Sequence, residues 1–294
     1  MTPIGLLNID KPPGISSRAA VDRVVRLVRP AKAGHAGTLD PIASGVLAVC
    51  IGRATRLIRY VQQWPKRYRA TFLLGYQSVT DDIEGDVQLL ESAPVPTQDA
   101  IVAATVELTG EIEQLPPAFS AVKVAGRRAY ELARKGKKVE LTPRNVTVYA
   151  LQVLAYRYPE LVLDIECSAG TYVRSLGRDL ATRLGTAAVM SALCRTAIGP
   201  LRVEDACRLD DLSPATLGDR LLPPLAAVGD LPSVALDASQ IEAVGRGMTV
   251  ALRDESIAIG AAEVAAVDAE HQLVAILVRR GSVWGPVCNL GCNR

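Results

Sequence analysis

Apolar residues recur with two different periods along the first part of the chain. Between residues 17 and 29 they form the stripe of an amphipathic helix, and four arginines lie on or near its polar side. A continuous apolar run from Val46 to Ile51 predicts a buried strand, and the alternation from Arg67 to Leu74 predicts a second one. The pattern therefore predicts a basic helix followed by strands, with a loop between them.

The same two periods continue further along. A helical stripe over residues 97–109 ends at Gly110, and the alternation from Leu161 to Cys167 predicts another strand. After a turn at Gly170, residues from about Tyr172 to Gly185 predict a helix, because four apolar positions fall on one face. Helices and strands are thus mixed along the chain.

Two stretches interrupt this pattern. Residues 116–145 begin with two prolines, followed by an apolar patch and then a cluster of Lys and Arg, which is typical of either a mobile basic insertion or a solvated loop. A proline-rich stretch from Leu222 to Pro232 predicts a boundary between a domain of residues 1–229 and one of residues 230–294. The second domain is expected to be small and β-rich, with a short helix over 238–245 and strands such as 273–279.

Length and composition fit this two-domain division. The chain has 294 residues, 49% of them hydrophobic, which is enough to bury a sizeable core. Its apolar runs are too short to span a membrane and its start lacks a secretory signal pattern, so we expect a cytoplasmic protein without membrane contact. The six cysteines are scattered without a CxxC pair, so we expect neither disulfides nor a metal site.

The net charge of +2 conceals an uneven distribution. Residues 1–75 carry 12 Lys and Arg against 3 Asp and Glu, whereas residues 76–115 carry 9 acidic residues and no basic ones. Residues 116–140 return to 7 basic against 2 acidic residues. Such polarity is typical of a protein that binds a phosphate backbone, although ordinary solvated helix faces can also produce it.

The loop between the basic helix and the first buried strand carries the strongest chemical motif. Residues 34–56 read GHAGTLDPIASGVLAVCIGRATR and place the single carboxylate of Asp40 among glycines, directly before Pro41. Glycines permit backbone conformations and close approaches that a Cβ would obstruct, and proline fixes the chain after the acid. The loop is suited to presenting an acid to a ligand.

This run resembles the motif of the TruB family of pseudouridine synthases. Further matches occur in the same order along roughly residues 5–200, namely LNIDKPPG at 7–14, KRYR at 66–69, PPAFSAVK at 116–123 and GTYVR at 170–174. The resemblance implies an α+β pseudouridine synthase fold, with a mixed, mainly antiparallel sheet flanked by helices and loops. It also implies a small PUA-like C-terminal domain and an RNA-gripping thumb at about 116–145.

The family resemblance further implies an activity. Members isomerise the uridine at position 55 in the T loop of tRNA to pseudouridine by flipping the base out, breaking the C–N glycosidic bond and rejoining the base through carbon. Because this needs no redox step or energy input, no cofactor is expected. We expect a monomer that acts on the T-stem-loop of tRNA without a guide RNA.

The motif positions also imply roles for individual residues. Asp40 would be the catalytic carboxylate, Arg174 its ion-pair partner, and Tyr68 a ring that stacks on the uracil and handles its proton. Four further residues would contact the substrate: His35, Tyr172, Leu193 and Lys11. From the residues alone, Asp40 also fits an Asx turn, Arg174 a phosphate contact, and Tyr68 and Leu193 plain core positions.

Several points stay open at this stage. Phosphate contacts could come from six basic residues, namely Lys11, Arg53, Arg56, Arg59, Arg67 and Arg69. Asp82 matches an acidic position of the family, whereas Val79 stands where the family usually has aspartate. The main alternative function is a noncatalytic tRNA-binding or chaperone protein on the same fold. A guide-dependent relative is disfavoured because the C-terminal region is short and carries 5 basic against 7 acidic residues.

Overall fold

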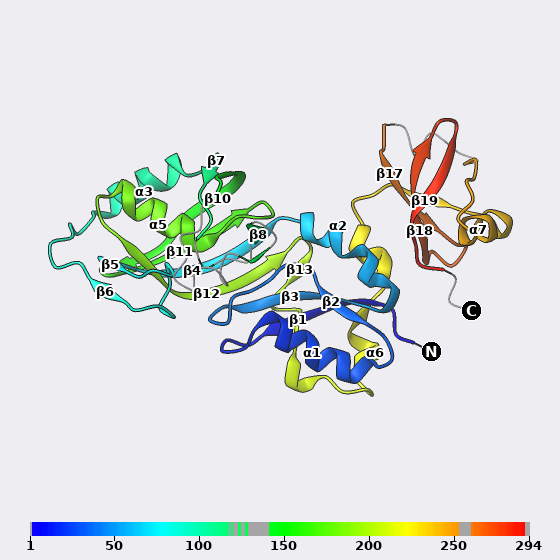
Figure 1. Cartoon of the computed structure of the whole chain (residues 1–294), viewed down its shortest axis with the longest axis horizontal. Coiled ribbons are helices and arrows are strands. Elements are labelled where there is room, and N and C mark those ends of the chain that lie inside the picture. The colour runs from blue at the N-terminus through cyan, green and yellow to red at the C-terminus, as the bar shows by residue number, and fades with distance from the viewer. Residues whose placement is uncertain are drawn as a thin grey trace.

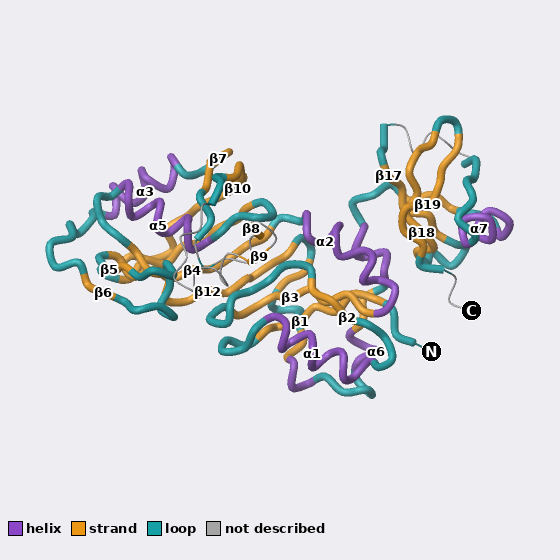
Figure 2. The backbone as a smooth tube through the Cα atoms, viewed as in Figure 1, coloured by secondary structure: helices purple, strands orange, loops and turns teal. Residues whose placement is uncertain are grey.

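Two β-sheets form the framework of the protein. The computed structural model describes residues 2–117, 119, 123–124, 127–128, 141–252 and 260–291. A sheet of eleven strands runs through the larger part of the molecule, and a sheet of four strands stands beside it near the C-terminus (Figure 1). Figure 2 shows that helices and long loops cover the larger sheet at several places. The structure therefore confirms the α+β class.

The large sheet is mixed and mainly antiparallel, as predicted. Its strands follow the order β14-β1-β3-β12-β4-β11-β10-β7, and its parallel pairs are β1 with β14 and β3 with β12. The bounds are β1 (Gly5–Lys11), β3 (Ser44–Ile51), β4 (Lys66–Leu74), β7 (Gly110–Gln114), β10 (Arg144–Arg157), β11 (Glu160–Cys167), β12 (Ala188–Ile198) and β14 (Cys207–Arg208). Short strands β2 (Ala33–His35), β13 (Leu201–Arg202) and β15 (Leu221–Leu222) pair with β3, β12 and β1.

Helices pack on this sheet through the faces that their sequences predict. In α1 (Ser17–Val28) the Ser16 hydroxyl accepts a hydrogen bond from the amide of Ala19, and an apolar face that includes Val21 and Val24 is buried against β1 and β3. In α5 (Val173–Arg183) Leu176 and Leu180 are buried against β4 and β12. The other helices are α2 (Ile58–Gln63), α3 (Gln98–Glu107), α6 (Leu217–Arg220) and the 3-10 helices η1 (Gly52–Leu57), η2 (Leu209–Asp211) and η3 (Pro224–Val228).

The C-terminal part of the chain is small and β-rich, as expected. Its sheet has the order β16-β17-β18-β19, with β16 (Ser233–Ala235), β17 (Glu263–Val267), β18 (Leu273–Arg280) and β19 (Val283–Asn289), beside helix α7 (Ala238–Gly245). One face packs around Trp284, whereas Ile276 and Leu290 join a cluster with Leu57 and Val61 of the larger part. The PUA-like assignment and the boundary at residue 229 stay predictions.

The predicted thumb at 116–145 lies mostly outside the described residues. Within it, β8 (Lys123–Val124) pairs with β9 (Arg127–Arg128). A second two-stranded sheet pairs β5 (Tyr76–Gln77) with β6 (Gln88–Leu89). Across the described ranges no helix is both long and apolar enough to cross a lipid bilayer.

Candidate active site

The loop that carries Asp40 is clamped by neighbouring elements. Ser17, at the start of α1, both donates to the carbonyl of Leu39 at 2.9 Å and accepts from its amide at 2.7 Å. The amide of Gly14 donates to the carbonyl of Pro41 at 2.8 Å. Since Ser17 is only 2% exposed, these bonds are shielded from water and hold the backbone on both sides of Asp40.

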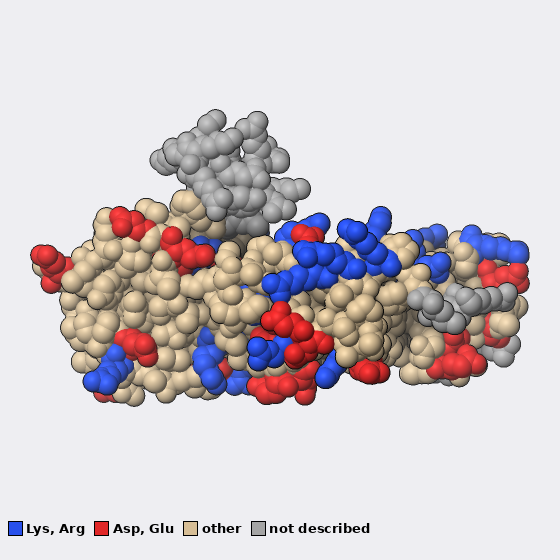
Figure 3. Space-filling model, turned by 90° about the horizontal axis from the view of Figure 1, so that it is seen from below, with Lys and Arg blue, Asp and Glu red and all other residues tan. Residues whose placement is uncertain are grey.

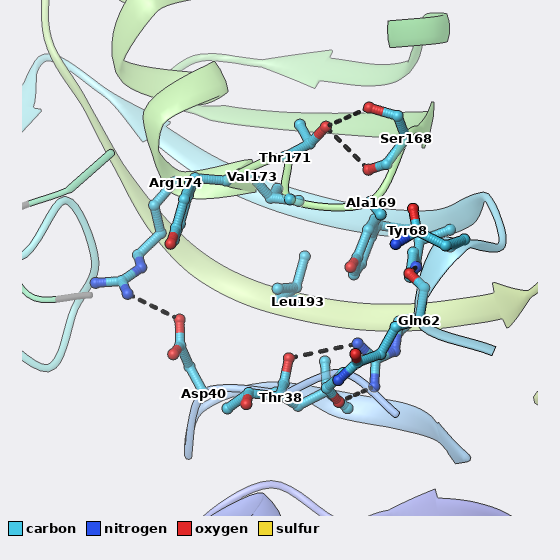
Figure 4. A pocket seen from close by; sticks show the side chains of 17 residues that line it. Thr38, Asp40, Gln62, Tyr68, Ser168, Ala169, Thr171, Val173, Arg174 and Leu193 are labelled. Atoms are coloured by element: carbon cyan, nitrogen blue, oxygen red, sulfur yellow. Dashed lines mark hydrogen bonds and ion pairs between the residues drawn. The ribbon is translucent and has the colours of Figure 1, made fainter. Parts of the chain in front are cut away.

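Arg174 forms an ion pair with Asp40 across the sheet. Its Nη2 lies 3.0 Å from Oδ2 of Asp40, and the side chains are 7% and 37% exposed. Figure 4 shows the two groups meeting at one side of a cavity. The guanidinium also donates to the carbonyls of Thr80 at 2.8 Å and Phe119 at 3.0 Å, so it is fixed from several directions. The structure thus brings together the carboxylate and the arginine of two distant motifs.

Asp82 is a second carboxylate on the same guanidinium. Its Oδ2 lies 3.1 Å from Nη1 of Arg174, and its side chain is 2% exposed. Oδ1 accepts from the hydroxyl of Thr80 at 2.6 Å and from the amide of Glu84 at 3.1 Å. The turn therefore orients Arg174, whereas Val79, which departs from the family pattern, is 73% exposed.

A cavity of about 530 Å³ opens beside this ion pair. Its lining contains five of the residues singled out from the sequence, namely Asp40, Tyr68, Tyr172, Arg174 and Leu193. In Figure 4, Asp40 and Tyr68 lie on opposite sides and Leu193 projects between them. Val173 and Leu193 belong to the buried apolar cluster. A flat ring could therefore be held between apolar and aromatic walls beside a carboxylate.

Tyr68 is fixed by the strand opposite it. It lies on the buried face of β4, is 8% exposed, and pairs directly with Arg195 of β12. Burial raises the pKa of the Tyr68 phenol, while the charge of Arg195 and its hydrogen bond to the phenol act in the opposite direction. The phenol is consequently kept protonated and rigid at neutral pH.

Tyr172 is held through its backbone. It precedes α5, and its amide donates to Oε1 of Gln114 at 2.7 Å while its carbonyl accepts from Nε2 of the same side chain at 3.0 Å. Gln114, at the end of β7, is 1% exposed. This two-bond clamp sets where the Tyr172 ring enters the cavity.

The structure places Lys11 and His35 outside the cavity lining. Lys11 was expected to contact the substrate, but it is fully buried and its ammonium donates to the carbonyls of Pro12 and Ile15, both at 2.8 Å. It therefore supports the Asp40 loop from behind. His35 lies in β2, at the start of the loop, and burial followed by the charge of Arg195 lowers its pKa. Its contact with RNA stays a prediction.

Two cations of the cavity escaped the sequence reasoning. Arg195 is 1% exposed and donates to the carbonyls of Val46 at 2.7 Å, Gly37 at 3.0 Å and Thr38 at 3.4 Å. Lys66 is 6% exposed and also lines the cavity. The sequence held a signal that could have identified them. Each is a charged residue at a strand position whose neighbours on the same face are mainly apolar, and a charged side chain is rarely buried without a partner.

Most of the six candidate phosphate contacts are engaged within the protein. Arg67 pairs with Asp164 at 2.7 Å, and Lys11 is buried. Three arginines of η1 and α2 contact the C-terminal sheet instead: Arg53 donates to the carbonyl of Leu290 at 2.7 Å, Arg56 to that of Asn289, and Arg59 pairs with Glu263 at 3.0 Å. Five of the six therefore already have partners within the protein.

The charge polarity predicted from the sequence is visible on the surface. On the face shown in Figure 3, Lys and Arg gather in a band that runs from the middle of the molecule toward its C-terminal part, and a group of Asp and Glu lies beside this band. The end of that face where β5 and β6 lie carries few charges and shows scattered acidic groups. The arginines of α1 at positions 18, 23, 26 and 29 are exposed. An anionic partner would be attracted to the basic band.

Sequence relatives cover nearly the whole chain. A protein of Dehalococcoides mccartyi named tRNA pseudouridine synthase B is 41% identical over 267 residues, covering 88% of this chain and 89% of that protein. One of the same name from Symbiobacterium thermophilum is 44% identical over 252 residues, covering 85% and 84%. Among solved structures, a Cbf5-Nop10-Gar1 complex matches with 28% identity and a TM-score of 0.70, over 95% of this chain and 79% of that one.

A further solved structure supports the fold. An H/ACA RNP bound to a substrate RNA containing 2'-deoxyuridine matches with 26% identity and a TM-score of 0.72, over 98% of this chain and 85% of that one. The family model of the TruB pseudouridylate synthase N-terminal domain matches residues 25–173, which include the Asp40 loop, β4 and the start of α5. The chain therefore belongs to the TruB family of pseudouridylate synthases.

Proposed function

We propose that this protein converts the uridine at position 55 in the T loop of tRNA to pseudouridine, without a guide RNA. The observation that carries the proposal is the Asp40–Arg174 ion pair at 3.0 Å on a cavity that also contains Tyr68, Tyr172 and Leu193. Relatives more than 40% identical are named tRNA pseudouridine synthase B, which supports tRNA as the substrate.

The geometry suits a base that has been flipped out of the RNA. Extruding a nucleotide costs a few kcal/mol, and stacking on an aromatic ring returns about 1–3 kcal/mol. Tyr68 and Tyr172 supply the rings, and Leu193 and Val173 supply apolar contact. The uracil would thus be held while its bond to the ribose is exchanged.

Asp40 is proposed as the activating group. Carboxylates act at glycosidic carbons as nucleophiles or as stabilisers of positive charge. Asp40 could bond to ribose C1′ as the bond to N1 breaks, or add to C6 of the ring before the base leaves. In both routes the uracil turns within the cavity, C5 bonds to C1′, the bond to Asp40 breaks, C5 loses its proton and N1 gains one. Arg174 and Asp82 keep the carboxylate oriented.

The test is tritium release from a T-arm transcript that contains [5-³H]uridine, with the purified protein alone. We expect release by the wild type and none by Asp40→Asn, while both bind the transcript with similar affinity. Asp164→Asn is a matched control, because that carboxylate pairs with Arg67 outside the cavity lining. Binding without release by the wild type would favour the noncatalytic alternative.

A further inference from the structure

Positive charge exceeds negative charge in the buried surroundings of the cavity. Four cationic side chains are at most 6% exposed there: Lys11, Lys66, Arg174 and Arg195. The carboxylates of Asp40 and Asp82 both pair with Arg174. Among the described residues, the other three cations donate hydrogen bonds only to neutral groups, although Lys11 is also attracted by the charges of Asp40, Glu84 and Asp10. Burying a cation without a counter-ion is unfavourable, so this arrangement suggests that an anion arrives during function.

Lys66 reaches the cavity with donor capacity left. It lies two residues before Tyr68 on the same buried face of β4 and lines the cavity. Its ammonium donates to the carbonyls of Gln62 and Trp64, both at 2.5 Å. An ammonium has three donors, so one N–H has no acceptor among the described residues.

Burial and a neighbouring charge make this ammonium ready to stabilise an anion. Desolvation, followed by repulsion from Arg195, lowers the pKa of Lys66 from 10.5 to about 8. Lys66 is therefore still protonated at neutral pH, in surroundings where water screens it poorly. An anion that enters the cavity would relieve the repulsion between these two cations.

The position of Lys66 argues for the base rather than a phosphate as this anion. Lys66, Tyr68 and Arg195 line the cavity and are 6%, 8% and 1% exposed, so they form buried parts of its wall. A phosphodiester is joined to the chain on both sides and would have to carry its riboses inside. A detached uracil has no such connection once its glycosidic bond is broken.

We propose that Lys66 is a catalytic residue that stabilises the uracil anion released during isomerisation. The proposal rests on the proposed function. When the C1′–N1 bond breaks, its electron pair stays on N1 and is shared with the ring oxygens, to which Nζ donates. When C5 bonds to C1′, that electron pair forms the new bond. Lys66 keeps its proton throughout, so the overall step remains an isomerisation.

The test compares two leaving groups under single-turnover conditions. T-arm transcripts carry either uridine or 5-fluorouridine at the target position, and loss of the target nucleoside is followed at a pH where both bases are neutral. Lys66→Ala and Lys66→Met are the variants, and the methionine keeps an unbranched stem if alanine prevents folding. Lys11→Met is the comparator, because Lys11 is equally buried but lies outside the cavity lining.

Removal of a preorganised donor lowers rates by about 100-fold or more, so we expect a loss of that size for the Lys66 variants on uridine. Fluorine stabilises the uracil anion. The factor by which the Lys66 variants are slower than the wild type should therefore be about tenfold smaller on 5-fluorouridine than on uridine. Lys11→Met should lose the same factor on both substrates, and the affinity of the Lys66 variants for RNA should be unchanged.

Equal reductions in the rate of the Lys66 variants on the two substrates would overturn the role of Lys66. A reduction in RNA affinity with an unchanged rate would do the same. Failure of the wild type to convert uridine would instead overturn the proposed function.

Discussion

Single side chains around the cavity act mainly by holding others in place. Arg174 lies between Asp40 and Asp82, and Ser17 and Gln114 each bind one backbone segment through a donor and an acceptor. Buried bonds of this kind resist rotation, because breaking one leaves a polar group without a partner. Asp40 therefore sits on a preorganised support and need not reorganise when the substrate binds.

Lys11 should make stability depend on pH in a definable window. Burial lowers the pKa of Lys11 from 10.5 to about 8, so between these values the unfolded chain binds more protons than the folded one. The stabilisation is present above the unfolded-state pKa and is lost as the pH falls through the folded pKa. We expect the free energy of unfolding of the wild type, relative to Lys11→Met, to rise by about 1.5 kcal/mol from pH 8 to pH 9.5.

Urea unfolding of both proteins at pH 6.5, 8 and 9.5 measures this difference. Groups shared by the two proteins cancel, including Lys66 and the cysteines. Between pH 6.5 and pH 8 the difference in the free energy of unfolding should change by only about 0.4 kcal/mol. A difference that stays constant up to pH 9.5 would show that Lys11 is not protonated as the structure indicates.

At the scale of elements, the contact of α5 with the sheet sets the position of Arg174. Gly177 faces Phe72 of β4, and a Cβ on it would lie 2.0 Å from the ring. Phe72 is 1% exposed and cannot turn away. The absence of a side chain at Gly177 lets the helix approach close enough for Arg174 to reach Asp40.

Gly177→Ala is expected to destabilise the protein by about 2–3 kcal/mol, because overpacking forces the helix away from the sheet. It should also slow tritium release, since Arg174 moves with the helix. Gly218→Ala in α6 is the matched control, because nothing lies within 4 Å of its added Cβ. Thermal unfolding and tritium release of both variants test this, and equal stability of the two would contradict the packing argument.

Periodicity predicted the elements that have one buried and one exposed side. The amphipathic stripe gave α1, and the alternation gave β4 and β11 within one or two residues of their observed ends. It missed β12, the strand between β3 and β4, because that strand is buried on much of both faces and Arg195 interrupts its apolar run. Local pattern carries no information on which distant strand will pair with it.

The site was predictable where motifs carry it and not where packing does. Asp40 and Arg174 lie 134 residues apart, yet their motifs named both, and the structure places them 3.0 Å apart. No role in the site could be assigned to Gln114 or Lys66 from the sequence. The position of each side chain depends on backbone carbonyls and amides that only the fold brings near. Lys11 belongs to a motif but lies buried outside the cavity lining, so its contact with the substrate stays a prediction.

At the scale of the whole molecule, the C-terminal sheet is joined to the larger sheet by more than a linker. Leu57 and Val61 share an apolar cluster with Ile276 and Leu290. Arg53, Arg56 and Arg59 add polar contacts to the same junction. An interface with a buried apolar centre favours a fixed relation between the two parts over free hinge motion.

The double variant Arg53→Gln, Arg59→Gln should loosen this junction without weakening phosphate contacts. We expect faster hydrogen exchange in β17–β19, whereas the slope of log K for RNA against log salt should stay unchanged. Had the two arginines bound phosphates, the slope would fall by about 0.7–0.9 for each. Arg246→Gln, which pairs with Glu242 on α7, serves as a control for both measurements.

The place of β12 in the large sheet has a consequence for how the protein is made. Its partners β3 and β4 leave the ribosome more than a hundred residues earlier, and β1 pairs with β14 and β15, which follow later still. Until residues 188–222 have been synthesised, the apolar edges of these early strands remain open. The nascent chain must therefore stay protected from aggregation through most of its translation, and the sheet closes only near the end of synthesis.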